Sequence, residues 1–320
     1  MDLPHCEAPT STVATEGQRR RSLRSALEAH RGWLENKATG KRADLTKAAL
    51  NGLTLERANL QRAILAGANL EETRLSGADF SGAELAGADF RRAQAVEADF
   101  TGADLSNATL NCAEFTEATL SEAILMKTVF QMANLRKALL QDASIRSCDF
   151  TEAILKGAAF HQATIFDCDF TKANLEDALM YHARISLSKF ISARLARANF
   201  THARLQSCDL HDAQLAGARF SQADLSYSCL SRAVLSGSDF RRAKLNGVDF
   251  GAADLSGCHF AESVLMMADL RGANLDRADG LTQSQLSQAR TDDRTILPNG
   301  SHGPFMKGTG AEKPRRPDCT

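Results

Sequence analysis

The sequence has no apolar run long enough to cross a membrane, because polar residues interrupt its apolar residues at short intervals. Residues 1–17 lack the positive start and apolar core of a secretory signal. The eight cysteines have no regular close spacing, which is typical of a reducing compartment. We therefore expect a cytoplasmic protein, with secretion that needs no signal left open.

Recognisable catalytic and cofactor motifs are missing as well. The sequence has no glycine-rich phosphate-binding loop, and no Ser, His and Asp set falls within a recognisable motif. We therefore predict no catalytic residues, no cofactor-binding residues and no metal ligands. The protein is expected not to be an enzyme.

What the sequence has in abundance is a five-residue repeat, which runs from Ala43 to Ala278 without a change of phase. A large apolar residue, mostly Leu or Phe, stands where the number ends in 0 or 5, and Ala95 interrupts this series of centres. Two residues before each centre stands a small residue, usually Ala. A period of five fits neither an α-helix nor a flat strand, so it predicts a solenoid whose coils bury their neighbours' apolar faces.

The positions of phenylalanine indicate how many sides each coil has. Of the 14 Phe at centres, all but Phe115 have numbers that end in 0. Three sides would mix the two endings on every wall, whereas four sides place equivalent residues twenty apart and keep the endings separate. At about 4.8 Å between stacked backbones, the repeat predicts about 12 four-sided coils.

Units such as "ADLTK", "ANLQR" and "ADFSG" resemble the A(D/N)Lxx unit of the pentapeptide repeat family. The resemblance covers about three quarters of the chain. It implies an all-β fold, a right-handed quadrilateral β-helix. It implies little about function, because the motif residues are structural.

The segments on either side of the repeat predict caps for the open ends of the solenoid. Leu23, Leu27, His30 and Trp33 share one face of a helix expected over 18–37, and such a cap would protect the open edge. Thr282 is a candidate N-cap for a short helix after the repeat. The predicted units are a disordered leader (1–17), a capping helix (18–42), the solenoid (43–280), a C-terminal helical cap (281–298) and a disordered tail (299–320).

Two sets of polar side chains inside the repeat invite a functional interpretation. Asp residues before the centres, such as Asp79, Asp89 and Asp249, form rows that we expect to satisfy backbone groups at the corners rather than to bind metal or mimic phosphates. Cys148, Cys168 and Cys208 share one inward column. We expect these cysteines to be small, reduced core residues, although a disulfide between adjacent coils is conceivable.

Charged columns on the outside give the candidate partner-binding residues. His182 and His202, twenty apart, should stack beside Arg184 and Arg204, where they could bind an anion or be ordinary surface. Residues 65–125 hold 3 basic and 11 acidic residues, and 184–244 hold 10 basic and 4 acidic. The rod is therefore predicted to be electrically bipolar, which would steer partners or favour antiparallel or end-to-end association, unless surface charge has simply drifted. The switch is visible in one column, which contains Glu84, Asp104, Arg184, Arg204 and Lys244.

These observations favour a rigid interaction or scaffold protein whose partner is another protein. The resemblance offers two alternatives, because family members include DNA mimics that bind gyrase, and such repeats also occur in secreted effectors and at secretion loci. DNA mimicry would be confined to 65–125. We expect no cofactor, no direct binding of nucleic acid and no membrane contact, and a homodimer through a solenoid end is possible.

Overall fold

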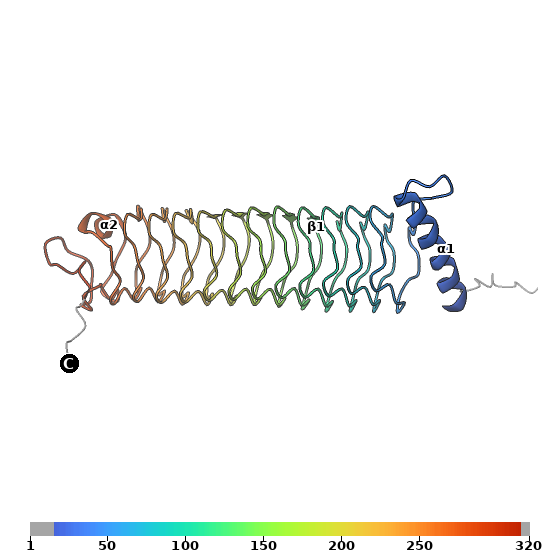
Figure 1. Cartoon of the computed structure of the whole chain (residues 1–320). Coiled ribbons are helices and arrows are strands. Elements are labelled where there is room, and N and C mark those ends of the chain that lie inside the picture. The colour runs from blue at the N-terminus through green and yellow to red at the C-terminus, as the bar shows by residue number, and fades with distance from the viewer. Residues whose placement is uncertain (1–15, 315–320) are drawn as a thin grey trace, which may run out of the picture.

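The computed structural model describes residues 16–314, which form one straight rod with a helix at each end (Figure 1). Helix α1 (Glu16–Leu34) lies across the N-terminal end, and the short helix α2 (Gln283–Gln288) lies at the other. Neither described helix is long and apolar enough to span a bilayer. Residues 1–15 of the predicted leader and residues 315–320 of the predicted tail lie outside the described residues.

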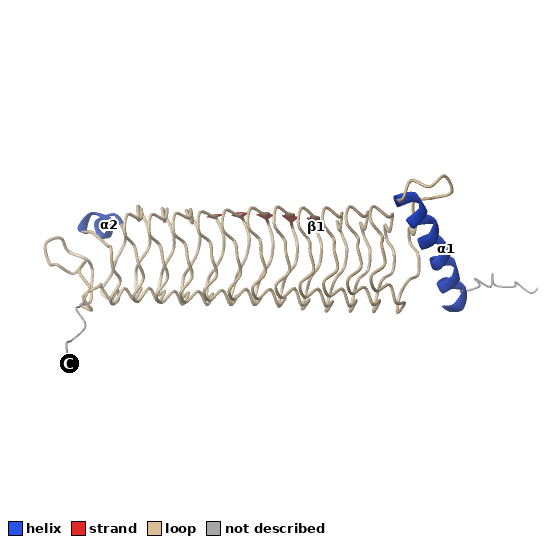
Figure 2. Ribbon diagram, viewed as in Figure 1, coloured by secondary structure: helices blue, strands red, loops and turns tan. Residues whose placement is uncertain are grey.

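Parallel pairing with a register of twenty residues holds the rod together. Five three-residue strands pair in sequence order as one sheet, and Figure 2 shows them in a row along one side of the rod. Isolated parallel bridges continue the same register on the other sides, as between Asp79 and Asp99. Twenty residues are four pentapeptides, so the prediction of a four-sided β-helix is confirmed. The strands are β1 (Ile124–Met126), β2 (Ser144–Arg146), β3 (Thr164–Phe166), β4 (Arg184–Ser186) and β5 (Arg204–Gln206).

The core is a set of stacked columns of large side chains. The rings of Phe150 and Phe170 lie 4.7 Å apart and almost parallel, and Phe170 repeats this contact with Phe190 at 4.8 Å. Phe160, on the opposed wall, meets Phe170 edge to face at 6.3 Å. Phe therefore occupies two opposed walls, as its numbering predicts.

Ala95 lies in the core, where the sequence predicts a void or local repacking. Its neighbour in the next coil of the same wall is Phe115, whose ring contacts Phe90 at 6.1 Å and Phe100 at 5.2 Å. Ala95 is fully buried. The exceptional large ring thus stands directly beside the exceptional small centre, so the packing adjusts within two coils.

The corners depend on residues in the left-handed backbone region, two places after each centre. Ser192 has φ 55°, and its N–H donates to the carbonyl of His211 in the next coil at 3.1 Å. The side chain of Asp79 accepts the N–H of Ser81 at 3.0 Å, and Asp249 accepts that of Gly251 at 2.8 Å. The expectation that the Asp rows satisfy backbone groups is therefore confirmed.

Helix α1 begins two residues earlier and ends three residues earlier than the range 18–37 expected from the sequence. Leu23 and His30 are buried, and Leu27 packs partly against the core. His30 Nδ1 accepts the N–H of Ala43 at 3.1 Å, so the helix is fixed to the start of the solenoid. Trp33 stacks on the His30 ring at 5.5 Å.

Acid is expected to loosen this N-terminal cap. Burial lowers the pKa of His30 from its ordinary 6.5, and the Arg42 charge adds to the effect. Since the folded state favours the neutral ring, the cap keeps its full stability above pH 6.5 and loses it as the pH falls through the lowered pKa. Fluorescence of Trp33, the single Trp, should change as the pH is lowered from about 7.5 to about 4.5. An unchanged transition in His30→Gln would contradict this assignment.

The C-terminal end is closed by more of the chain than the sequence suggests. Thr282 and Gln285 form a capping box at α2, and the Gln285 amide also donates to the Ser263 carbonyl at 2.8 Å. The sequence predicts disorder from residue 299, yet residues 299–314 are described, and Ala311 is buried. The N–H of Asn299 donates to the Ala311 carbonyl at 3.3 Å, so this segment folds back onto the cap.

Candidate functional site

The candidate residues at positions 182–204 come together in one groove. The rings of His182 and His202 are stacked 4.8 Å apart with an angle of 4° between them. Arg184 and Arg204 are register partners in β4 and β5. Together with Asp142 and Gln162, these four side chains line an open groove of about 610 Å³, which we call the His/Arg groove.

The repeat itself fixes the backbone beneath this groove. His182 and His202 both have φ 59°, and their N–H groups donate to the carbonyls of Thr201 and Ser221 at 3.0 Å each. Both imidazoles are exposed at the corner. The ring of Tyr181 meets His182 edge to face at 6.0 Å, which supports the imidazole from the side. The backbone hydrogen bonds thus fix where the two imidazoles enter the groove.

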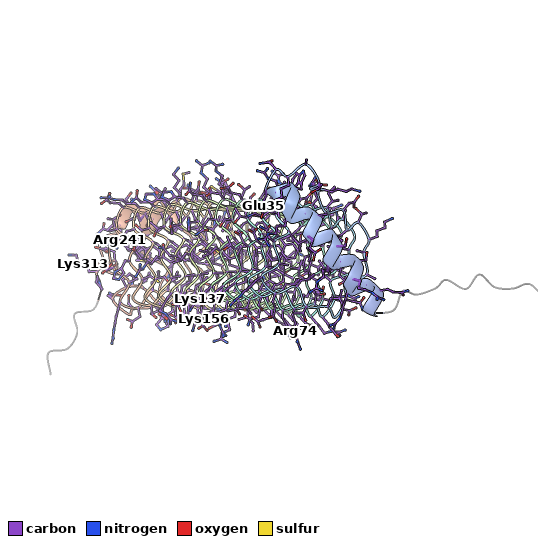
Figure 3. The ribbon with its side chains drawn as sticks, turned by 45° about the vertical axis from the view of Figure 1, so that its right-hand side comes forward. Glu35, Arg74, Lys137, Lys156, Arg241 and Lys313 are labelled. Atoms are coloured by element: carbon purple, nitrogen blue, oxygen red, sulfur yellow. The ribbon has the colours of Figure 1, made fainter. Side chains whose placement is uncertain are left out.

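Some arginines of the rod form ion pairs with a neighbouring coil, and others, including those of the His/Arg groove, do not. Several oppositely charged pairs join neighbouring coils: Arg197 contacts Asp177 at 2.7 Å and lowers the pKa of that carboxyl. Lys137 and Lys156, labelled on the outside of the rod in Figure 3, also contact carboxylates one coil away. Within residues 16–314, by contrast, neither Arg184 nor Arg204 forms an ion pair or a side-chain hydrogen bond. Ion pairs between neighbouring coils, like that of Arg197 with Asp177, also join Arg232 to Asp212 and Arg242 to Glu262.

The structure separates the remaining predicted residues from the groove. Lys244 follows Arg204 in the same column, but Asp224 lies between them. Glu84 and Asp104 are register neighbours several coils away, and Glu84 contacts Arg42 at 2.7 Å. The seven candidates therefore lie along one side of the rod without forming a single site.

Two groove residues, Asp142 and Gln162, were not among the sequence candidates. They precede His182 and His202 in the same corner column at intervals of twenty residues. The register predicted from the Phe positions was the signal that could have found them. Their chemistry matters, since Asp142 gives one end of a basic groove a negative charge.

Exposed apolar side chains gather on the side that carries β1–β5. We call this side, continued to both ends of the rod, the sheet face. Met126 and Phe166 are 45% and 40% exposed in β1 and β3, and Leu187, just after β4, is 54% exposed. The sheet face therefore combines apolar and charged side chains. Its other exposed large apolar residues are Ile124, Tyr227, Val264, Met266 and Met267.

The cysteine column is part of the core. Cys148, Cys168 and Cys208 are buried and unbridged. The N–H of Cys168 donates to the Ser188 hydroxyl at 3.1 Å, and burial raises the pKa of Cys208 to about 12. A hydrogen bond with the Cys148 thiol, together with burial, raises the pKa of Cys168. Residues 16–314 hold no group of three or more His, Cys, Asp or Glu side chains that could bind a metal.

Two protein-family models match most of the rod. The model described as pentapeptide repeats matches eight copies, and the model described as a pentapeptide repeat region matches residues 97–165. No curated protein gives a significant match. The pentapeptide repeats model matches residues 41–77, 73–111, 183–222, 218–257 and 243–279.

Several solved structures are similar to this chain. HetL, a pentapeptide repeat protein involved in heterocyst differentiation regulation from the cyanobacterium Nostoc sp. strain PCC 7120, is 28% identical; the match covers 77% of this chain and 94% of HetL, with a TM-score of 0.35. Full-length QnrB1, a plasmid-mediated fluoroquinolone resistance protein, is 20% identical over 53% of this chain and 92% of its own, with a TM-score of 0.36. A protein of the Arabidopsis thaliana thylakoid lumen is 31% identical over 36% of this chain and 66% of its own, with a TM-score of 0.23.

Proposed function

This chain belongs to the pentapeptide repeat family, and from that premise we propose that it is a non-enzymatic interaction protein. Its rigid rod presents charged columns to another protein. The columns concerned are those of the sheet face and of the His/Arg groove. A cytoplasmic location is part of the proposal.

The observation that carries this proposal is the unpaired state of Arg184 and Arg204 within residues 16–314. Like charges placed next to each other on a ladder are unfavourable, and Arg184 and Arg204 are direct register partners. Some other arginines find a carboxylate one coil away, as Arg197 finds Asp177. An acidic surface of another protein would supply the missing counter-charges.

Mimicry of DNA by the acidic coils has weaker support. A DNA mimic needs continuous negative charge, but Arg91 and Arg92 contact Glu71 at 3.3 and 2.7 Å inside these coils. Arg91 also contacts Asp89 at 2.6 Å. The acidic stretch is therefore partly neutralised by its own arginines.

Charge reversal tests the proposed function directly. A tagged chain is expressed together with an untagged copy, and the proteins that co-purify at low and at physiological salt are identified. We expect a specific protein, either a different chain or the untagged copy, to be captured and to be lost from Arg184→Glu/Arg204→Glu. The matched control is Arg232→Glu/Arg242→Glu, which reverses two arginines that have carboxylate partners within the rod and should still capture the protein. Capture of no specific protein by the unaltered chain, or equal capture by both double variants, would contradict the proposal.

A further inference from the structure

We propose that the sheet face binds a second copy of this chain in an antiparallel dimer, whose two-fold axis runs along the strand direction at Ser144 of β2. The inference rests on the proposed function, because it names the partner of that surface. An axis in this direction reverses the order of the coils in the second copy. Each outward column then faces the same column of that copy. The face is an ordered parallel sheet at this point, so its columns are straight and fixed in register.

The charges of the column that contains Ser144 match under this operation. Glu84 lies three coils before Ser144, and Arg204 lies three coils after it; Asp104 and Arg184 lie two coils before and after. In the dimer, Glu84 and Asp104 face Arg204 and Arg184 of the second copy. Asp44 and Lys244, at five coils on either side, match in the same way. The symmetry repeats each pair, and no like charges face each other in this column.

Several pairs in the neighbouring columns match as well. Met126 and Phe166, one coil on either side of the axis, face each other and bury two half-exposed apolar side chains. In the corner column, Lys127 faces Asp167. Tyr227 is 74% exposed, and the residue opposite it is Gly67, which has no side chain to obstruct the ring. These pairs are therefore complementary in shape and charge.

Other arrangements of two rods fit these residues less well. A parallel pair would place acidic coils against acidic coils and basic coils against basic coils. Association through an end is obstructed by the caps, because α1 covers the first coil, and α2 with residues 299–314 closes the last. The sheet face is uncovered and has most of the exposed large apolar side chains of the described residues.

Like charges that the axis brings together oppose the dimer. In the corner column of the His/Arg groove, Asp142 faces Asp142 of the second copy, and Arg42 faces Arg242. Arg146 lies on the axis and faces Arg146 of the second copy, and it has no carboxylate partner within residues 16–314. Arg146→Ser is therefore expected to strengthen the dimer about tenfold. A weaker dimer in this variant would contradict an axis at this coil.

The decisive test is a charge exchange followed by analytical ultracentrifugation of the purified full chain. The unaltered chain should sediment as a dimer that high salt weakens. Glu84→Arg/Asp104→Arg and Arg184→Glu/Arg204→Glu should each weaken the homodimer about a hundredfold or more, because like charges then face each other. Mixing these two variants should restore the dimer, as should combining all four substitutions in one chain. Circular dichroism establishes that each variant is folded.

Cross-linking fixes the orientation. In a chain whose exposed and terminal cysteines are replaced by serine, Ser144→Cys should form a disulfide-linked dimer under mild oxidation, and Gln214→Cys on the opposite side should not. A monomeric unaltered chain, or a dimer that survives both charge reversals, overturns the dimer. If such a monomer still captures a different protein through Arg184 and Arg204, the proposed function stands and only this inference fails.

Discussion

Phe170→Ala is expected to lower the free energy of unfolding by about 3–5 kcal/mol. The Phe170 ring is fully buried and contacts Phe150, Phe190 and Phe160. Truncation removes apolar surface and leaves a cavity between two stacked rings, where backbone pairing on both sides limits collapse of the neighbouring coils. Urea unfolding followed by circular dichroism measures the loss.

Two further variants make the result interpretable. Phe170→Leu keeps most of the volume and should cost less than Phe170→Ala, with the remainder reflecting the lost ring contacts. Lys189→Ala changes an exposed side chain on the same side of the rod and should stay within about 0.5 kcal/mol of the unaltered chain. A loss below about 1 kcal/mol for Phe170→Ala would mean that the solenoid relaxes around single coils.

The fold could be predicted from the sequence because the pattern that determines it is short and is repeated along the chain. The five-residue period and the numbering of Phe predict the four-sided coil, and the twenty-residue register confirms it. The position of regular strands could not be predicted in this way. Units such as "ARISL" and "AELAG" carry the same centre pattern and lie on the same side of the rod, yet only the first contains a three-residue strand.

The candidate site could be predicted in part. Twenty-residue spacing places His182 over His202 and Arg184 beside Arg204, as observed. Whether an arginine contacts a carboxylate depends on how far its side chain reaches. The twenty-residue spacing of the sequence does not predict this reach. Arg194 contacts Glu176, which is 18 residues earlier, whereas Arg184 finds no such partner within residues 16–314.

The chain ends lie outside the repeat, so the periodicity says nothing about them. Residues 299–314 are rich in Gly and polar side chains, a composition that predicts disorder. They are held by contacts with the last coil and with the helix that follows it: Gln283 donates to Glu312 at 3.3 Å, and the N–H of Gly303 donates to the Thr295 carbonyl at 2.8 Å. Composition cannot predict this docking, because it depends on the surface that the solenoid end provides.

Ser192→Pro is expected to destabilise the rod by about 3 kcal/mol or more. Ser192 is an exposed corner residue with φ 55°, which the proline ring cannot adopt. Proline also removes the N–H that donates to His211 in the next coil, so a carbonyl inside the ladder loses its partner. The substitution leaves the core side chains unchanged, which separates the backbone contribution from the packing tested at Phe170.

Glycine at the same position provides the opposite control. Ser192→Gly keeps the N–H and removes the steric cost of a left-handed L-residue, although glycine also raises the entropy of the unfolded chain. These effects oppose each other, so we expect a change within about 1 kcal/mol. Urea unfolding of both variants, with hydrogen exchange in the coils around His211, measures the difference. If proline were tolerated as well as glycine, the corners would not depend on the left-handed backbone, and the rigidity that aligns the charged columns would need another source.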